Sequence, residues 1–163
     1  MSGTIRQPMT SPYEEIISLL ETNNVAHRET RHAPVYTVEQ AAKATGVRPS
    51  QIAKSLLLKC GSGFILAVLP GDKRLSSTKL KSLLKTGEFH FANAEEVKSQ
   101  MGCEIGACYP FGNLIGLPVY ADNSLSKNEV IFCNPGSHDR TLELKWRDFY
   151  TLVKPKIVNI SEK

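Results

Sequence analysis

Two short apolar runs, close together in the chain, limit its fold more than any other feature. Ser55-Leu56-Leu57-Leu58 and Phe64-Ile65-Leu66-Ala67-Val68-Leu69 are separated by a segment that contains Gly61-Ser62-Gly63. Apolar runs of this length with glycines between them indicate a β-hairpin. The second run has no polar residue that could face water, which is typical of a strand covered on both faces. The sequence therefore predicts a hairpin with at least one fully buried strand.

Helical patterns lie before and after this hairpin. Ser11-Pro12 offers an N-cap and a proline in the first turn, and Ile16, Leu19 and Leu20 follow at helical spacing. Thr37 and Gln40 stand in capping-box register for a second helix. Further helices are expected over 76–86 (with Gly87 as the stop), 94–101 and 146–153, and further strands over 25–31, 88–91, 117–121, 130–133 and 141–144. Because these elements do not alternate regularly, we predict an α+β domain around a mixed, partly closed sheet.

The length and charge of the chain narrow its class. With 163 residues, 41% of them hydrophobic and 22% charged, it has the size and composition of one soluble domain. We expect that domain over 13–155, with a loose lead-in over 1–12 and a C-terminal tail over 156–163. No apolar run approaches bilayer length and no signal peptide is recognisable, so we expect a cytoplasmic protein without membrane contact. The net charge of +4 mildly favours polyanionic partners.

The cysteines do not suggest a metal site or a disulfide framework. Cys60, Cys103, Cys108 and Cys133 contain no C-x-x-C pair. We therefore expect four free thiols, no metal and no cofactor. A thiol-based redox or peroxide-handling function that uses Cys108 is kept as one alternative.

Three segments could carry chemistry. Lys54 stands among apolar residues at the entry to a strand, where its ammonium either reaches the surface or enters a cleft as a partly desolvated cation. The tight loop Gly106-Ala107-Cys108-Tyr109-Pro110-Phe111-Gly112 could turn successive backbone N–H groups toward an oxyanion. The loop over 134–139 offers polar groups from Asn134, Ser137, His138 and Asp139.

Basic residues gather around one predicted helix. Lys73 and Arg74 precede it, and Lys81 and Lys85 lie four residues apart on it, away from its leucines. Such a strip is either an ordinary solvated face or a contact for phosphates.

Taken in order, these segments resemble the YbaK/prolyl-tRNA synthetase-associated family of aminoacyl-tRNA editing domains. The resemblance runs from about residue 13 to residue 153 and rests on five motifs. They are His32-Ala33-Pro34-Val35-Tyr36-Thr37, Ile52-Ala53-Lys54-Ser55-Leu56-Leu57-Leu58, Gly71-Asp72-Lys73-Arg74-Leu75, the G-x-x-x-P loop that begins at Gly106, and the loop and strand over 134–144. The resemblance implies a mixed, β-barrel-like sheet flanked by helices, with a cleft between the lysine and the G-x-x-x-P loop.

The resemblance also implies roles for individual residues. Lys54 and Gly106 match the positions of the catalytic groups. The residues expected to hold the substrate are Tyr36, Ser55, Ala107, Cys108, Pro110, Asn134, Gly136, Ser137 and His138, and those expected to hold tRNA are Lys73, Arg74, Lys81 and Lys85. Some alanine-specific relatives carry histidine-proline where this chain has Asn134-Pro135, which weakens the case for alanine specificity.

The activity implied by the resemblance is hydrolysis of the ester between a small, wrong amino acid and the 3′ end of tRNA(Pro) or a similar tRNA. Such an ester is already activated, so positioned water and a stabilised oxyanion are enough, and the ribose hydroxyl or a bound water could take the proton. A cysteinyl ester could instead be attacked by its own thiol. Cysteine, alanine, serine and threonine all remain open as the amino acid.

The implied partners are the acceptor end of a mischarged tRNA and an aminoacyl-tRNA synthetase, with the protein itself a monomer or a weak dimer. The main alternative is a non-catalytic tRNA- or nucleotide-binding regulator that uses the same cleft.

Overall fold

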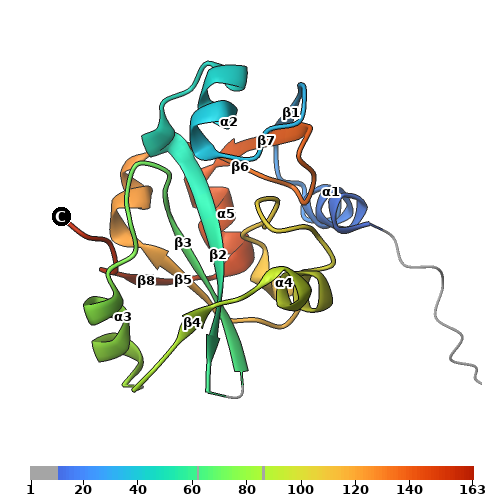
Figure 1. Ribbon diagram of the computed structural model, residues 1–163. Helices are drawn as coiled ribbons and strands as arrows, with labels where there is room; N and C mark the ends of the chain where they lie inside the picture. The colour runs from blue at the N-terminus through green and yellow to red at the C-terminus, as the bar shows by residue number, and fades with distance from the viewer. Residues whose placement is uncertain (1–10, 62, 86) are drawn as a thin grey trace, which may run out of the picture.

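The computed structural model describes residues 11–61, 63–85 and 87–163 (Figure 1). Within these ranges one mixed sheet of eight strands is flanked by five α-helices, which confirms the predicted α+β class. The strands are β1 (His27–Arg31), β2 (Ile52–Cys60), β3 (Gly63–Pro70), β4 (His90–Phe91), β5 (Val119–Asp122), β6 (Val130–Cys133), β7 (Arg140–Lys145) and β8 (Lys156–Val158). The helices are α1 (Pro12–Thr22), α2 (Val38–Thr45), α3 (Ser77–Leu84), α4 (Ala94–Met101) and α5 (Trp146–Val153).

The predicted hairpin is the centre of the sheet, whose strand order is β1-β7-β6-β2-β3-β5-β8. β2 and β3 pair antiparallel from Ala53 opposite Pro70 to Cys60 opposite Gly63. Alternate residues of β3 are buried on opposite faces. Leu66 and Val68 belong to the larger core cluster, whereas Ile65, Ala67 and Leu69 belong to the smaller one. This burial on both faces is the reason that the run contains no polar residue.

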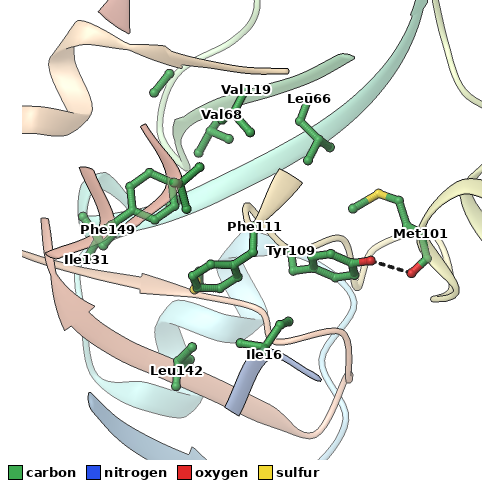
Figure 2. Packing of buried hydrophobic residues seen from close by; sticks show 14 of the residues in the cluster. Ile16, Leu66, Val68, Met101, Tyr109, Phe111, Val119, Ile131, Leu142 and Phe149 are labelled. Atoms are coloured by element: carbon green, nitrogen blue, oxygen red, sulfur yellow. Dashed lines mark hydrogen bonds between the residues drawn. The ribbon is translucent and has the colours of Figure 1, made fainter. Parts of the chain in front are cut away.

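Helices cover both sides of the hairpin. The larger cluster takes side chains from α1, α4 and α5, and Figure 2 shows Ile16, Met101 and Phe149 within it. The smaller cluster takes Leu80 from α3, and Figure 1 shows α3 across the hairpin from α1 and α4. In the described part of the chain, no helix has the length and hydropathy to cross a bilayer.

Most helix ends follow local sequence signals. Ser11 and Glu14 form a capping box at the start of α1, and Gly46 ends α2 in the left-handed conformation with a φ of 74°. α3 ends earlier than predicted: its last residue is Leu84, and Lys85 takes the left-handed conformation with a φ of 54°. Residue 86, which we predicted to be helical, lies outside the described residues.

The two ends of the chain differ from the expected boundaries. Residues 1–10 of the expected lead-in lie outside the described residues, while Ser11 and Pro12 cap and begin α1. The segment over 156–163, which we expected to be a tail, packs on the domain, because β8 pairs in parallel with β5 and the side chain of Ile160 is fully buried. Buried Asp122 holds this segment, since its Oδ1 accepts hydrogen bonds from the backbone N–H groups of Ile160 and Ser161, each at 2.9 Å.

One edge of β2 has two partner strands with a gap between them. β6 pairs in parallel with β2 at Ile52 and Ala53, and β4 pairs antiparallel at Leu58 and Lys59. β3 covers the opposite edge along nearly the whole strand. Among the described residues, no strand therefore lies beside residues 54–56 on the first edge, and the sheet is open there.

Candidate functional site

A cavity of about 370 Å³ lies at this gap in the edge of β2. β2 contributes residues 52–57 to its wall, and the ends of β4 and β6 contribute Phe91 and Cys133. The rest of the wall comes from residues 35–38, Ala41, Ala92, Val97, Ile105, Gly106, Cys108, Asn134 and Thr141. The gap between the two partner strands thus opens into a cavity large enough for a small ligand, with a mostly apolar lining and a few polar groups.

Large apolar side chains surround the cavity. Tyr36, Phe91 and Ile105 are 61%, 57% and 55% exposed, respectively, and all three line it. Exposed apolar groups gathered around one hollow are typical of a ligand-binding site. Sequence reasoning missed Phe91 and Ile105, because nothing in their local spacing shows that β4 pairs with β2 beside the gap.

Lys54 supplies a cation to the cavity wall. Its Nζ donates a hydrogen bond to the backbone carbonyl oxygen of Lys73 at 2.7 Å. Burial lowers the pKa of Lys54; among its charged neighbours Glu39 and Asp72 raise this pKa, while Arg74 lowers it. An ammonium has three N–H donors, so two remain for a ligand. A half-buried cation with free donors suits a phosphate or an ester oxygen.

Ser55, the next residue, also lines the cavity. Its Oγ is buried and has no hydrogen-bond partner among the described residues. A buried hydroxyl without a partner costs free energy, which a ligand that bonds to it can recover. Lys54 and Ser55 thus line the same cavity.

The G-x-x-x-P loop contributes Gly106 and Cys108 to the wall of the cavity. Gly106 has a φ of 90°, and a Cβ built on it would lie 3.5 Å from Cε1 of His138. Ala107 and Pro110 are buried and do not line the cavity. They anchor the loop together with Tyr109, whose hydroxyl donates to the carbonyl oxygen of Met101 at 2.7 Å, as Figure 2 shows.

The backbone N–H of Ala107, next to Gly106, is already engaged. The N–H of Ala107 donates to the carbonyl oxygen of Glu104 at 2.9 Å. Cys108 has a lowered pKa: a hydrogen bond from the thiol of Cys103 lowers it, burial opposes this effect, and the backbone N–H of Gly106 lowers it further. Of the backbone N–H groups near Gly106, that of Ala107 is thus not free to meet an oxyanion.

The loop over 134–139 contributes less to the wall than predicted. Asn134 lines the cavity, and its Oδ1 accepts hydrogen bonds from the backbone N–H groups of Gly136 and Ser137, each at 2.8 Å. Gly136 and Ser137 do not line the cavity. Asn134 therefore shapes the turn that follows it while facing the hollow.

His138 connects three loops instead of lining the cavity. Its Nδ1 lies 3.1 Å from the carbonyl oxygen of Val35, and its Nε2 lies 3.2 Å from a carboxylate oxygen of Glu104. Its ring stands 4.5 Å from the ring of Tyr36, measured between centroids. This residue positions the loops that carry Tyr36 and Gly106.

None of the four predicted tRNA contacts lines the cavity. Lys73 and Arg74 lie close to Lys54. The backbone carbonyl oxygen of Lys73 accepts the hydrogen bond of the Lys54 ammonium, and the charge of Arg74 lowers the pKa of Lys54. Lys81 forms a loose ion pair with Glu88, with 3.8 Å between nitrogen and oxygen. Lys85 is exposed at the end of α3.

Sequence comparison finds relatives that cover most of the chain. The family model described as the aminoacyl-tRNA editing domain matches residues 32–152. The uncharacterized protein YwhH of Bacillus subtilis is 37% identical over 123 residues, which cover 75% of this chain and 76% of YwhH. The proline–tRNA ligase of Thermotoga maritima is 32% identical over 131 residues, which cover 74% of this chain and 22% of the ligase. The chain thus spans about a fifth of the length of the curated ligases it matches.

Structure comparison finds the same fold in freestanding chains. The crystal structure of the hypothetical protein APE2540 superposes with a TM-score of 0.84 at 25% identity, covering 91% of this chain and 99% of that one. A structure described as a candidate trans-editing enzyme for prolyl tRNA synthetase superposes with a TM-score of 0.83 at 23% identity, covering 96% of this chain and all of that one.

Proposed function

The chain belongs to the aminoacyl-tRNA editing domain family, and we propose that it hydrolyses the ester bond of a mischarged aminoacyl-tRNA. The observation that carries this proposal is the half-buried ammonium of Lys54 in the wall of a mostly apolar cavity. Such a hollow suits a substrate end that combines a small side chain, a ribose and a phosphate.

In the proposed reaction, water adds to the ester carbonyl, the bond between that carbon and the ribose oxygen breaks, and the ribose oxygen leaves with a proton. The ester is activated by its chemistry, so the protein has to position it and stabilise the developing negative charge. Lys54 keeps two N–H donors for the terminal phosphate or the oxyanion. The neighbouring ribose hydroxyl or a bound water would move the proton, and a cysteinyl ester could use its own thiol.

The relatives support a more specific proposal. Several matched proteins are proline–tRNA ligases, and this chain corresponds to about a fifth of each. We therefore propose that the protein acts in trans on tRNA(Pro) or a similar tRNA that carries a small wrong amino acid. Lys73, Arg74, Lys81 and Lys85 would contact its phosphates, and a prolyl-tRNA synthetase would be the natural partner enzyme.

The direct test is a panel of tRNAs carrying cysteine, alanine, serine, threonine or proline, assayed for loss of the ester. Hydrolysis of at least one mischarged tRNA, with correctly charged prolyl-tRNA spared, is the expected result. Binding without turnover across the panel would indicate a regulator instead. The thiol-redox alternative requires Cys108, so a Cys108→Ser variant that still deacylates would exclude it.

A further inference from the structure

The peptide groups of β2 point alternately to its two edges. On the β3 side, the carbonyl oxygen of Ile52 accepts a hydrogen bond from the N–H of Gly71 at 2.8 Å. On the other side, the carbonyl oxygen of Leu57 accepts one from the N–H of Ala92 at 2.9 Å. In such a strand, the N–H and the carbonyl oxygen of one residue point to the same edge, and those of the next residue point to the other edge. The N–H and carbonyl groups of Ala53, Ser55 and Leu57 therefore point toward the edge where β6 and β4 pair.

Ser55 falls in the gap between those two partner strands. The ladder with β6 ends at Ala53, and the ladder with β4 begins at Leu58. No backbone hydrogen bond links Ser55 to either strand within 11–61, 63–85 and 87–163. The N–H and the carbonyl oxygen of Ser55 therefore face the cavity, which this residue lines. Native structures rarely leave such groups unpaired, so a ligand is the expected partner.

An aminoacyl ester carries the two hydrogen-bonding groups that would pair with the N–H and the carbonyl oxygen of Ser55. Its α-nitrogen is a donor and its acyl carbonyl is an acceptor, in the same order and separation as in one residue of a β-strand. In an antiparallel pair, two opposite residues exchange both of these hydrogen bonds. A single aminoacyl group can therefore complete the open edge of β2 as an added strand residue would.

We propose that the aminoacyl group docks on the main chain of Ser55, whose N–H donates to the ester carbonyl oxygen and whose carbonyl accepts from the α-ammonium. This inference rests on the proposed deacylase function. It moves the oxyanion donor from the G-x-x-x-P loop, where the N–H group of Ala107 is engaged, to β2. It also explains how one site can accept different small side chains, because it recognises groups that all amino acids share.

The test compares Ser55→Pro with Ser55→Ala. Proline removes the N–H, and at this position it breaks no ladder bond, because the N–H of Ser55 points to the open edge. Alanine removes the unpaired hydroxyl and keeps the N–H. We expect the turnover of Ser55→Pro to be at least about tenfold lower than that of Ser55→Ala, since loss of one oxyanion donor typically costs about 100- to 1,000-fold. Equal turnover in the two folded variants would overturn the proposal.

A second measurement does not depend on a proline being tolerated. Amide hydrogen exchange of the wild-type protein is followed by NMR, with and without an analogue in which an amide links the amino acid to the 3′ nitrogen of 3′-amino-3′-deoxyadenosine. The exchange of the Ser55 N–H should slow on binding, while that of Gly106 changes little. Protection at Gly106 and none at Ser55 would place the oxyanion donor in the loop after all.

A set of esters on the same tRNA separates this inference from the proposed function. Alanyl-tRNA is compared with propionyl-tRNA, which lacks only the α-amine, and each rate is divided by the spontaneous hydrolysis of the same ester. The acceleration of the propionyl ester should be at least about tenfold smaller, because its charge-assisted bond to the Ser55 carbonyl is missing. If no ester of the panel is cleaved, the proposed function fails. If both esters are accelerated equally, the function stands and the docking mode is wrong.

Discussion

The ammonium of Lys54 donates a hydrogen bond to the backbone carbonyl of Lys73, with 2.7 Å between the nitrogen and the oxygen. This bond ties the side chain to the segment between β3 and α3, so the cation cannot swing freely out of the cavity wall. It also brings Lys73 and its neighbour Arg74, two of the residues proposed to contact tRNA, close to the site. The position of the Lys54 ammonium is thus set by a contact between residues 19 positions apart in the chain.

Replacing Lys54 with alanine should lower the rate of deacylation by at least about tenfold, since a hydrogen bond to a charged group is worth roughly 1.5–3 kcal/mol. Steady-state deacylation of the best mischarged tRNA measures the effect. Lys59→Ala is the matched control, because Lys59 is another half-buried lysine of β2 and does not line the cavity. Turnover of a folded Lys54→Ala protein at the wild-type rate would remove the main support for the proposed function.

The Gly106→Val variant should lose most of its deacylase activity, while its melting temperature falls only moderately and the protein stays folded. A side chain at a φ of 90° is strained, and its atoms would reach the ring of His138 and the carbonyl of Tyr36. Gly116→Val is the control, because Gly116 also has a positive φ, of 70°, but a Cβ added there would have no atom within 4 Å. Both variants should lose stability, and Gly106→Val alone should lose activity. Equal losses of activity would mean that the effect is general strain.

Removing two charges from α3 and its C-terminal end should weaken the salt dependence of tRNA binding. Each phosphate contact contributes roughly 0.7–0.9 to the slope of log K against log salt. Lys81→Ala combined with Lys85→Asn should raise the Michaelis constant and flatten that slope, with turnover at saturation little changed. Asparagine is chosen because Lys85 has a φ of 54°, which asparagine tolerates. An unchanged slope and Michaelis constant would show that these lysines form an ordinary solvated face.

Asp122→Ala should destabilise the fold by about 2–4 kcal/mol at pH 7, because the N–H groups of Ile160 and Ser161 would be left buried without a partner.

This destabilisation should depend on pH. Burial raises the pKa of Asp122, but hydrogen bonds from Ser124, Ile160 and Ser161 outweigh this effect, so the pKa is lowered overall. A lowered pKa stabilises the folded state above the unfolded value of about 3.9, and this contribution is lost as the pH falls through the folded value. Urea unfolding at pH 7 and at pH 3 should therefore show a smaller difference between wild type and variant in acid. A difference independent of pH would contradict the charged role of Asp122.

Local patterns determined much of this protein from the sequence. The hairpin was predictable because glycines bound two apolar runs, and the starts of α1 and α2 were predictable because a cap involves residues three positions apart. Lys54, Ser55, Tyr36, Gly106, Cys108 and Asn134 could be proposed as site residues from motif order, and they meet at one cavity.

The tertiary structure alone decided how that cavity is made. Its opening depends on where β6 stops and β4 begins along β2, and these strands are separated from β2 by tens of residues. The role of Asp122 is likewise decided by long-range contacts. Its side chain accepts hydrogen bonds from residues 38 and 39 positions away and so holds the last segment of the chain against the sheet. No local spacing encodes which backbone groups such long-range pairing leaves unpaired. The side chain of Ser55 could be named from the sequence, but its open peptide groups follow only from the way distant strands share one edge.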